Sequence, residues 1–198
     1  MTKMNPLKAT LSALTLISIG GLVACSGGGG TSNPPPPAKT IADRLDFTPA
    51  TGTYTLVKNA SSTSTHLVLD LVGPANAQAS GVGFYLSADT NKVTWAKVNS
   101  SDAEFVKNGV FNLGSGTQLI KSKVVGNDLQ AGVYQKGTTV ASVTLTATTV
   151  LASVALDLKS NVALGAVSFS APSGKAVLTN GSATPVVITI TPGTISAN

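Results

Sequence analysis

The chain has 198 residues, which is enough for one domain with short extensions. Only 11% of the residues are charged, against about 25% in ordinary soluble domains, and Glu104 is the single glutamate. Strong helix formers are therefore scarce, and abundant Thr, Val, Ser and Gly favour strands and turns. The net charge of +5 includes Lys3 and Lys8, and no basic run follows them, which argues against nucleic-acid binding.

Residues 1–24 have the pattern of an export signal. Lys3 and Lys8 form a short positive region, and residues 9–24 contain no charge. This apolar stretch is shorter than the roughly 20 apolar residues of a membrane-spanning helix and has the length typical of a signal peptide. Its last residues, Leu22-Val23-Ala24-Cys25, match the lipobox of bacterial lipoprotein precursors. The alternative is an ordinary signal peptide followed by an incidental cysteine.

Cys25 is the only cysteine, so an intrachain disulfide is excluded and the thiol is the predicted lipidation site. The mature protein is expected to begin at this acylated residue, and several acyl chains anchor a protein stably in a membrane. Ser26 follows in place of Asp, which resembles lipoproteins sorted to the outer membrane. The sequence therefore predicts a lipid-anchored protein of the cell envelope, at the outer membrane, with the side that the domain faces left open.

Residues 25–39 are expected to form a disordered tether between the lipid and the domain. Gly27 to Gly30 favour a flexible chain, and Pro34 to Pro37 favour a stiffer polyproline II segment. The glycines precede no strand or helix, so they do not indicate a phosphate-binding loop. A proline tract can also bind an aromatic groove, but a spacer explains this composition more simply.

Residues 40–198 show the period-two alternation of short strands separated by turn residues. In 66–72, Leu67, Leu69 and Leu71 share one face, and His66 and Asp70 share the other. About 9–10 strands at this spacing predict an all-β fold, a single β-sandwich or jelly roll. The segment 100–110 fits the alternation least and is compatible with a helical turn. The predicted strands are 53–58, 66–72, 81–87, 93–96, 118–125, 129–135, 140–147, 150–158, 166–170, 176–179 and 186–191.

One of these strands resembles a known family. Gly83-Phe-Tyr-Leu-Ser-Ala-Asp89 is similar to the G-F-x-L-x-x-D strand near the start of cohesin-type domains. The segments 129–134, 150–159 and 165–169 follow in the order of later cohesin strands. The resemblance implies a nine-stranded jelly roll that binds dockerin modules through one sheet face; related domains occur in surface adhesins. The resemblance identifies no individual site residue in this chain, because the binding face of cohesins is not marked by a motif that this sequence matches.

His66 is the only histidine, which makes it the first candidate for catalysis. A Ser-His-Asp triad needs direct contacts, whereas Asp70 lies four positions away on the same strand, about 13 Å along it. No G-x-S-x-G motif supplies a nucleophile, and the ligands for a His- or Cys-based metal or haem site are lacking. We therefore interpret His66 as a solvent-facing strand residue and expect His66→Ala to cost within about 0.5 kcal/mol.

Two further pairs of side chains could also carry chemistry. Asp89 and Asn91 have the spacing of the start of a calcium loop, but no EF-hand Gly and Glu follow, so a turn is the better interpretation. Asp102 and Glu104 could form a glycosidase-type acid pair, which we consider the weaker hypothesis. The sequence thus indicates no catalytic, cofactor-binding or metal-binding residue.

Three aromatic residues could form a platform for sugars: Trp95, Tyr85 and Tyr134. Trp95 alternates in phase with Val93, which favours packing in the core. The leading hypothesis is a non-enzymatic, cohesin-like binding or adhesion module with a protein or glycan partner and no cofactor. The alternatives are a structural subunit of a surface assembly, whose strand edges and Thr-rich faces pack on copies of itself, and, more remotely, a hydrolase.

Overall fold

In a computed structural model, the described residues are 38–137, 141–182 and 184–198. They contain strands and turns but no helix, which confirms the all-β prediction. Residues 38–198 form one compact unit built on two six-stranded sheets. The predicted signal and most of the tether, including Cys25, lie outside the described residues.

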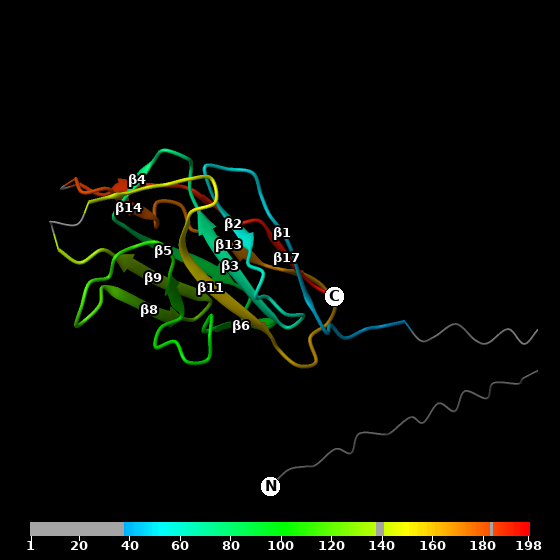
Figure 1. The fold of residues 1–198 in the computed structure, drawn as a ribbon. Helices are drawn as coiled ribbons and strands as arrows, with labels where there is room; N and C mark the ends of the chain where they lie inside the picture. The colour runs from blue at the N-terminus through cyan, green and yellow to red at the C-terminus, as the bar shows by residue number, and fades with distance from the viewer. Residues whose placement is uncertain (1–37, 138–140, 183) are drawn as a thin grey trace, which may run out of the picture. The chain divides into compact units, whose positions relative to one another are not determined.

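The first sheet has the order β16-β2-β3-β11-β6, with β7 also paired to β11 (Figure 1). Neighbouring strands in this sheet are antiparallel, except that β16 and β2 are parallel. The long β11 pairs with β3, β6 and β7 and so connects most of the sheet. The strands are β2 (Tyr54–Lys58), β3 (His66–Val72), β6 (Val93–Ala96), β7 (Val106–Asn108), β11 (Val150–Leu158) and β16 (Ile190–Thr191).

The second sheet has the order β15-β14-β5-β9-β8, with β13 also paired to β5. β8 and β9 form a two-residue hairpin at Gly126-Asn127, where Gly126 has the positive φ (59°) that a type II′ turn gives to glycine. The turn expected between the predicted strands 118–125 and 129–135 is therefore present. The strands are β5 (Gly81–Ala88), β8 (Ile120–Val125), β9 (Asp128–Tyr134), β13 (Phe169–Ser170), β14 (Val177–Thr179) and β15 (Val186–Val187).

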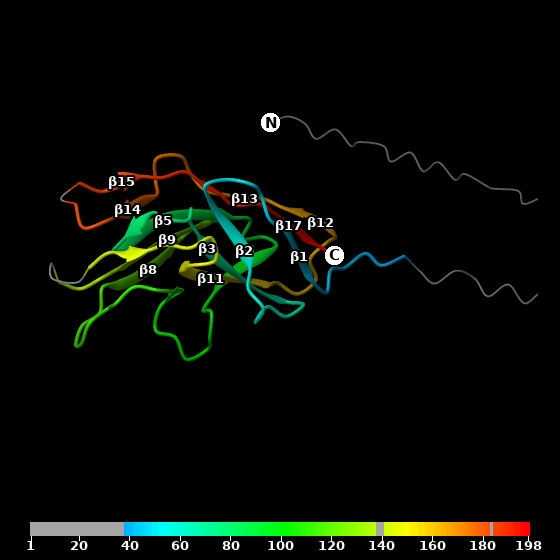
Figure 2. The same cartoon turned by 45° about the horizontal axis from the view of Figure 1, so that its top comes forward.

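Two small sheets complete the domain. β1 (Leu45–Thr48), β17 (Thr194–Ala197) and β12 (Gly165–Val167) form one of them, at the end where the C-terminus lies (Figure 2). β4 (Gln78–Ala79) and β10 (Val143–Thr144) form the other. The strands are shorter and more numerous than predicted: 166–170 and 186–191 each divide into two, and β7 lies in 100–110, where a helical turn seemed possible.

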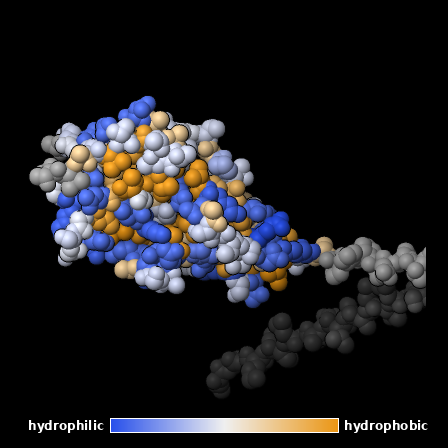
Figure 3. Space-filling model, viewed as in Figure 1, coloured by the Kyte–Doolittle hydropathy of each residue, from blue (hydrophilic) through white to orange (hydrophobic). Residues whose placement is uncertain are grey.

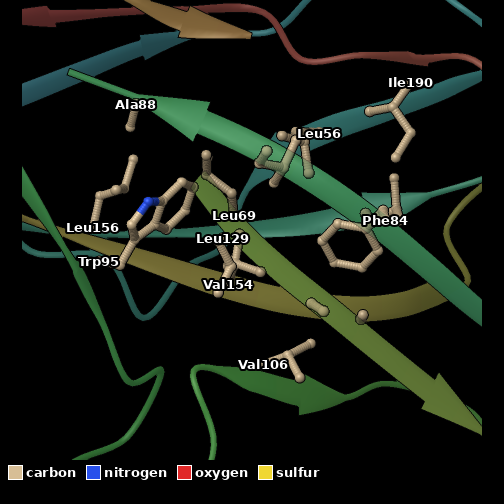
Figure 4. Close-up of a cluster of buried hydrophobic side chains, with 14 of the residues drawn as sticks. Leu56, Leu69, Phe84, Ala88, Trp95, Val106, Leu129, Val154, Leu156 and Ile190 are labelled. Atoms are coloured by element: carbon tan, nitrogen blue, oxygen red, sulfur yellow. The ribbon is translucent and has the colours of Figure 1, made fainter. Parts of the chain in front are cut away.

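The core lies between the two large sheets (Figure 4). Leu56, Leu69 and Leu156 of the first sheet meet Phe84 and Leu129 of the second, all at most 1% exposed. Burial of these apolar side chains is the main force that holds the sheets together. Elsewhere, hydrophobic side chains also gather in the upper part of the surface seen in Figure 3, among hydrophilic ones.

Candidate binding surface

The outer face of the second sheet carries two half-buried tyrosines. In β5, Phe84 and Leu86 are buried in the core, so the alternating Tyr85 faces outward. In β9, Leu129 and Val133 are buried, and Tyr134 faces outward in the same way. We call this surface the tyrosine face; its outward side chains are Tyr85, Ser87, Lys121, Lys123, Val125, Asp128, Gln130, Tyr134, Ser170, Val177, Thr179 and Val187.

Tyr134 lies flat on three glycines of this face. A Cβ atom at Gly81 would clash with ring atom Cδ1, one at Gly83 with the hydroxyl oxygen, and one at Gly132 with Cε2. Cδ1 and Cε2 are opposite corners of the ring, so the plane of the ring lies along the sheet. Only glycine leaves room for the ring at these three positions. An aromatic residue that covers glycines in this way is a known arrangement in β-sheets. Burial also raises the pKa of Tyr134 above its usual value.

The other half of the tyrosine face is polar and positively charged. Tyr85, Gln130 and Lys123 lie side by side across β5, β9 and β8. They line an open hollow of about 410 Å³ with Lys121. The ammonium of Lys175 lies 5.9 Å from the centre of the Tyr85 ring, which is within range of a cation–π interaction. The surface thus combines an aromatic ring with lysines and an amide.

Glu104 stabilises the edge strand β8 rather than pairing with Asp102. Its Oε2 accepts hydrogen bonds of 2.8 Å from both the N–H and the hydroxyl of Ser122, and its Oε1 lies 3.2 Å from the ammonium of Lys121. Asp102 instead accepts a 2.8 Å hydrogen bond from the N–H of Asn99. Both carboxylates line a hollow of about 280 Å³, but each is engaged in local structure, so the geometry does not support an acid pair.

These contacts make stability depend on pH. Partial burial raises the pKa of Glu104, but the hydrogen bonds from Ser122 and the charge of Lys121 outweigh burial and hold the pKa below its ordinary 4.5. Because the folded pKa is lowered, this stabilisation is present above pH 4.5 and disappears as the pH falls through the folded value. We therefore expect Glu104→Gln to be less stable than the wild type at neutral pH.

Urea unfolding at neutral pH and at about pH 3 checks this expectation. The difference in unfolding free energy between the two proteins should shrink in acid. A difference that is constant over this range would show that the carboxylate charge does not stabilise β8.

The outer face of the first sheet is covered at β3, contrary to the interpretation of its polar side as facing solvent. On β3, Val68 is fully buried and Asp70 is 7% exposed, although both point away from the core. Asp70 accepts hydrogen bonds of 2.6 Å from the amide of Asn59 and from the hydroxyl of Ser153. The loop that carries Asn59 thus lies against this face, so the polar side of the strand is not open to water.

His66 is also held in place on this face. Its Nδ1 lies 2.5 Å from Oδ1 of Asp157 on β11, and its Nε2 lies 3.3 Å from the carbonyl oxygen of Val98. Ser153 bonds to Asp70 instead, so the structure does not bring the histidine and the serine together as a triad would. The interpretation of His66 as a solvent-facing residue is wrong, because its side chain is only 27% exposed.

We therefore revise the expected effect of His66→Ala. The variant loses a hydrogen bond to a carboxylate and a weaker contact to a carbonyl, which should lower the free energy of unfolding by about 1–2 kcal/mol. Chemical denaturation measures this change. Thr94→Ala is a matched control, because Thr94 is exposed and pairs with Asp157 from β6, whereas His66 pairs with Asp157 from β3. Equal effects of the two variants would show that the histidine contacts contribute nothing.

Other candidates from the sequence have structural roles. Asp89 accepts 3.0 Å hydrogen bonds from the N–H and the amide of Asn91, which confirms the turn. Trp95 is 5% exposed, donates to the carbonyl of Asn127 over 2.9 Å and packs on Phe169, which confirms its place in the core. Among the described residues, no group of three or more His, Cys, Asp or Glu side chains could hold a metal ion.

The predicted lipidation site Cys25 lies outside the described residues, so its role stays a prediction. Within the part of the chain that the structure describes, no helix has the length and apolar character to cross a membrane.

Known proteins resemble this chain in fold but not in sequence. No protein-family model matches the chain, and no curated protein shows a significant match. The sixth cohesin of Acetivibrio cellulolyticus scaffoldin B, solved in complex with a Cel5 dockerin mutant, superposes with a TM-score of 0.50 at 18% identity, over 72% of this chain and 97% of the cohesin. Because identity is low, this similarity shows the fold alone: residues 38–198 form a cohesin-like β-sandwich.

Two further structural matches are cohesin modules. The OlpC cohesin of Clostridium thermocellum, in complex with Doc435, has a TM-score of 0.46 at 11% identity, over 79% of this chain and 94% of that module. The cohesin module of a Clostridium perfringens family 33 glycoside hydrolase has a TM-score of 0.45 at 11% identity, over 78% and 99%.

Proposed function

We propose that this chain is an envelope lipoprotein, anchored in the outer membrane through Cys25, whose β-sandwich is a non-catalytic module that binds a protein partner. The contact surface in this proposal is the part of the tyrosine face around Tyr85. The observation that carries the proposal is the outward-facing row of Tyr85, Gln130 and Lys123 across three strands, on a domain with a cohesin-like fold.

The composition of this surface supports protein binding. Tyrosine is enriched at protein interfaces because its ring packs against apolar groups while its hydroxyl stays hydrogen-bonded. The rim carries Lys121, Lys123 and Lys175 against two carboxylates, Asp128 and the Glu104 that pairs with Lys121, so a positive excess remains and favours a partner with an acidic rim. The outer face of the first sheet is less suited, because its own loops already cover Val68 and Asp70.

The first candidate partner is a small module of the dockerin kind. The scaffoldin B cohesin was solved in complex with a Cel5 dockerin, and we extend that partner class to this chain as part of the proposal. A pull-down from envelope extract with residues 38–198 tests it, because these residues form a compact unit with their own core. Capture of a distinct protein that then binds the purified domain directly supports the proposal; recovery of the bait alone contradicts it.

A structural subunit is the second candidate, and one observation favours it. Val186 and Val187, which make up the edge strand β15, are 48% and 64% exposed, and the strand itself contains no lysine. Copies of the chain could extend the second sheet by pairing there. Concentration-dependent self-association of residues 38–198, with no foreign protein captured, would favour this function over partner binding.

Lipidation is tested separately from binding. Replacing Cys25 by Ser removes the thiol that forms the thioether to diacylglycerol, so we expect uncleaved precursor and no acylated product. Mass spectrometry of membrane fractions measures both. Ser26→Ala is the matched control and should leave processing intact. An unacylated mature N-terminus in the wild type would contradict the anchor, whatever the domain binds.

A further inference from the structure

A second hollow lies at the other end of the tyrosine face, beside Tyr134. It has a volume of about 310 Å³ and lies where β5 begins and β9 and β14 end. None of the side chains that line it is charged, and most of them can form hydrogen bonds. The lining residues are Ser80, Tyr134, Gln135, Gly137, Thr179, Gly181 and Ser182.

The apolar part of this hollow is the ring of Tyr134. One side of the ring rests on Gly81, Gly83 and Gly132, and the ring lines the hollow from this fixed position. A ring held flat by the backbone loses little conformational entropy when a ligand stacks on it, because its orientation is set before binding. The three glycines therefore pre-form a stacking surface.

The polar part is a group of neutral donors and acceptors. The hydroxyl of Ser80 donates to Thr179 Oγ1 over 3.2 Å and accepts from the N–H of Gly181 over 3.1 Å, so Thr179 keeps its own hydroxyl proton for another acceptor. Oε1 of Gln135 is buried and has no hydrogen-bond partner among the described residues. A buried acceptor without a donor is costly, and a ligand hydroxyl can supply the missing donor after a small rotation of the amide.

We infer that this hollow binds one ring of an uncharged carbohydrate, which goes beyond the proposed binding of a protein. A sugar ring has a C–H face that stacks on an aromatic ring and hydroxyls at its edge that bond to hydroxyl and amide groups. The hollow offers both kinds of group in one place. Its lack of charged side chains disfavours phosphate, acidic sugars and charged peptide side chains, which need an opposite charge to offset desolvation.

An NMR titration of residues 38–198 with hexasaccharides of glucose, xylose and N-acetylglucosamine tests this inference. We expect at least one of them to shift the amide signals of Tyr134, Thr179 and Gly181. Tyr134→Phe keeps the ring and should keep binding, whereas Tyr134→Ala should weaken it about tenfold or more, the equivalent of one lost stacking contact. Absence of shifts with all three sugars, or shifts confined to other parts of the domain, would overturn the inference.

Gly132→Ala tests the role of the glycines without removing the ring. Its Cβ would lie 2.9 Å from Cε2 of Tyr134, so the ring must lift from the sheet, and we expect weaker sugar binding. Tyr85→Ala is the matched control: it removes the other tyrosine of the same face and should leave sugar binding unchanged. If Tyr85→Ala weakens sugar binding as much as Tyr134→Ala does, the site is not the hollow beside Tyr134. Because Tyr85 belongs to the proposed protein-binding surface, the two proposals can fail independently.

Discussion

Replacing Phe84 by Ala is expected to lower the free energy of unfolding by about 3–5 kcal/mol, the largest effect of any single change considered for this domain. Phe84 is 1% exposed and lies between the two sheets with Leu56, Leu69 and Leu129 (Figure 4). The substitution removes a large buried surface and leaves a cavity that closely packed neighbours cannot fill. Urea unfolding should show a lower midpoint with little change in its slope.

The neighbouring residue provides the control. Tyr85 follows Phe84 in β5 but points outward, so Tyr85→Ala loses only surface packing and the contact with Lys175, about 0.5–1 kcal/mol. A large loss of stability from Tyr85→Ala with a small loss from Phe84→Ala would mean that the opposite face of β5 points into the core. That result would place Tyr85 in the core and remove the proposed protein-binding surface.

Replacing Asp70 by Ala is expected to lower the free energy of unfolding by about 3 kcal/mol, because one buried donor and one half-buried donor lose their acceptor. The amide of the half-buried Asn59 and the hydroxyl of the buried Ser153 each lie 2.6 Å from one carboxylate oxygen. Hydrogen bonds to a charged group are stronger than neutral ones, and donors left unpaired in a buried position keep their desolvation cost. The loop that carries Asn59 should also become more mobile, which hydrogen exchange of its amides measures.

Asp70→Asn is the conservative control for this network. Its amide oxygen still accepts one of the two hydrogen bonds, and its amide nitrogen can donate to the hydroxyl of Ser153 after that hydroxyl turns. We expect a loss smaller than that of Asp70→Ala. Equal losses in the two variants would show that the negative charge, and not the number of hydrogen bonds, stabilises this face.

The β-sandwich could be predicted from the sequence because its central strands alternate strongly. In 66–72 and 81–87 the apolar residues recur at every second position, and these segments form β3 and β5 almost to the residue. The short strands could not be predicted in the same way. β1, β7 and β17 have three or four residues each, too few to show a period, and pairing with distant strands determines them.

The covered face of β3 shows a second limit of sequence analysis. Polar residues on alternate positions normally indicate a face open to water, and His66 and Asp70 fit that pattern. Here Asn59, Ser153 and Asp157 come from other segments and satisfy both side chains, so the face is polar and yet covered. Only the tertiary structure brings these partners together.

The glycine spacing in the sequence is a signal for the site beside Tyr134. Gly81-Val-Gly83 leaves two successive positions on one face of its strand without side chains, and Gly132 leaves one such position on the same face as Tyr134 in Gly132-Val-Tyr134. Two such strands side by side leave space for one large ring. The sequence alone could not show that β5 and β9 pair in the register that brings these glycines under Tyr134.

The affinity of the captured protein partner for variants of the two sheet faces tests the central claim most directly. The double variant Tyr85→Ala with Lys123→Ala removes the aromatic ring and one charge from the tyrosine face. The control variant Thr94→Ala with Lys107→Ala removes exposed side chains from the first sheet. We predict that the first variant binds about tenfold or more weakly while the control binds like the wild type. Unchanged binding by the first variant, or a loss confined to the control, would contradict the claim that the tyrosine face binds the partner.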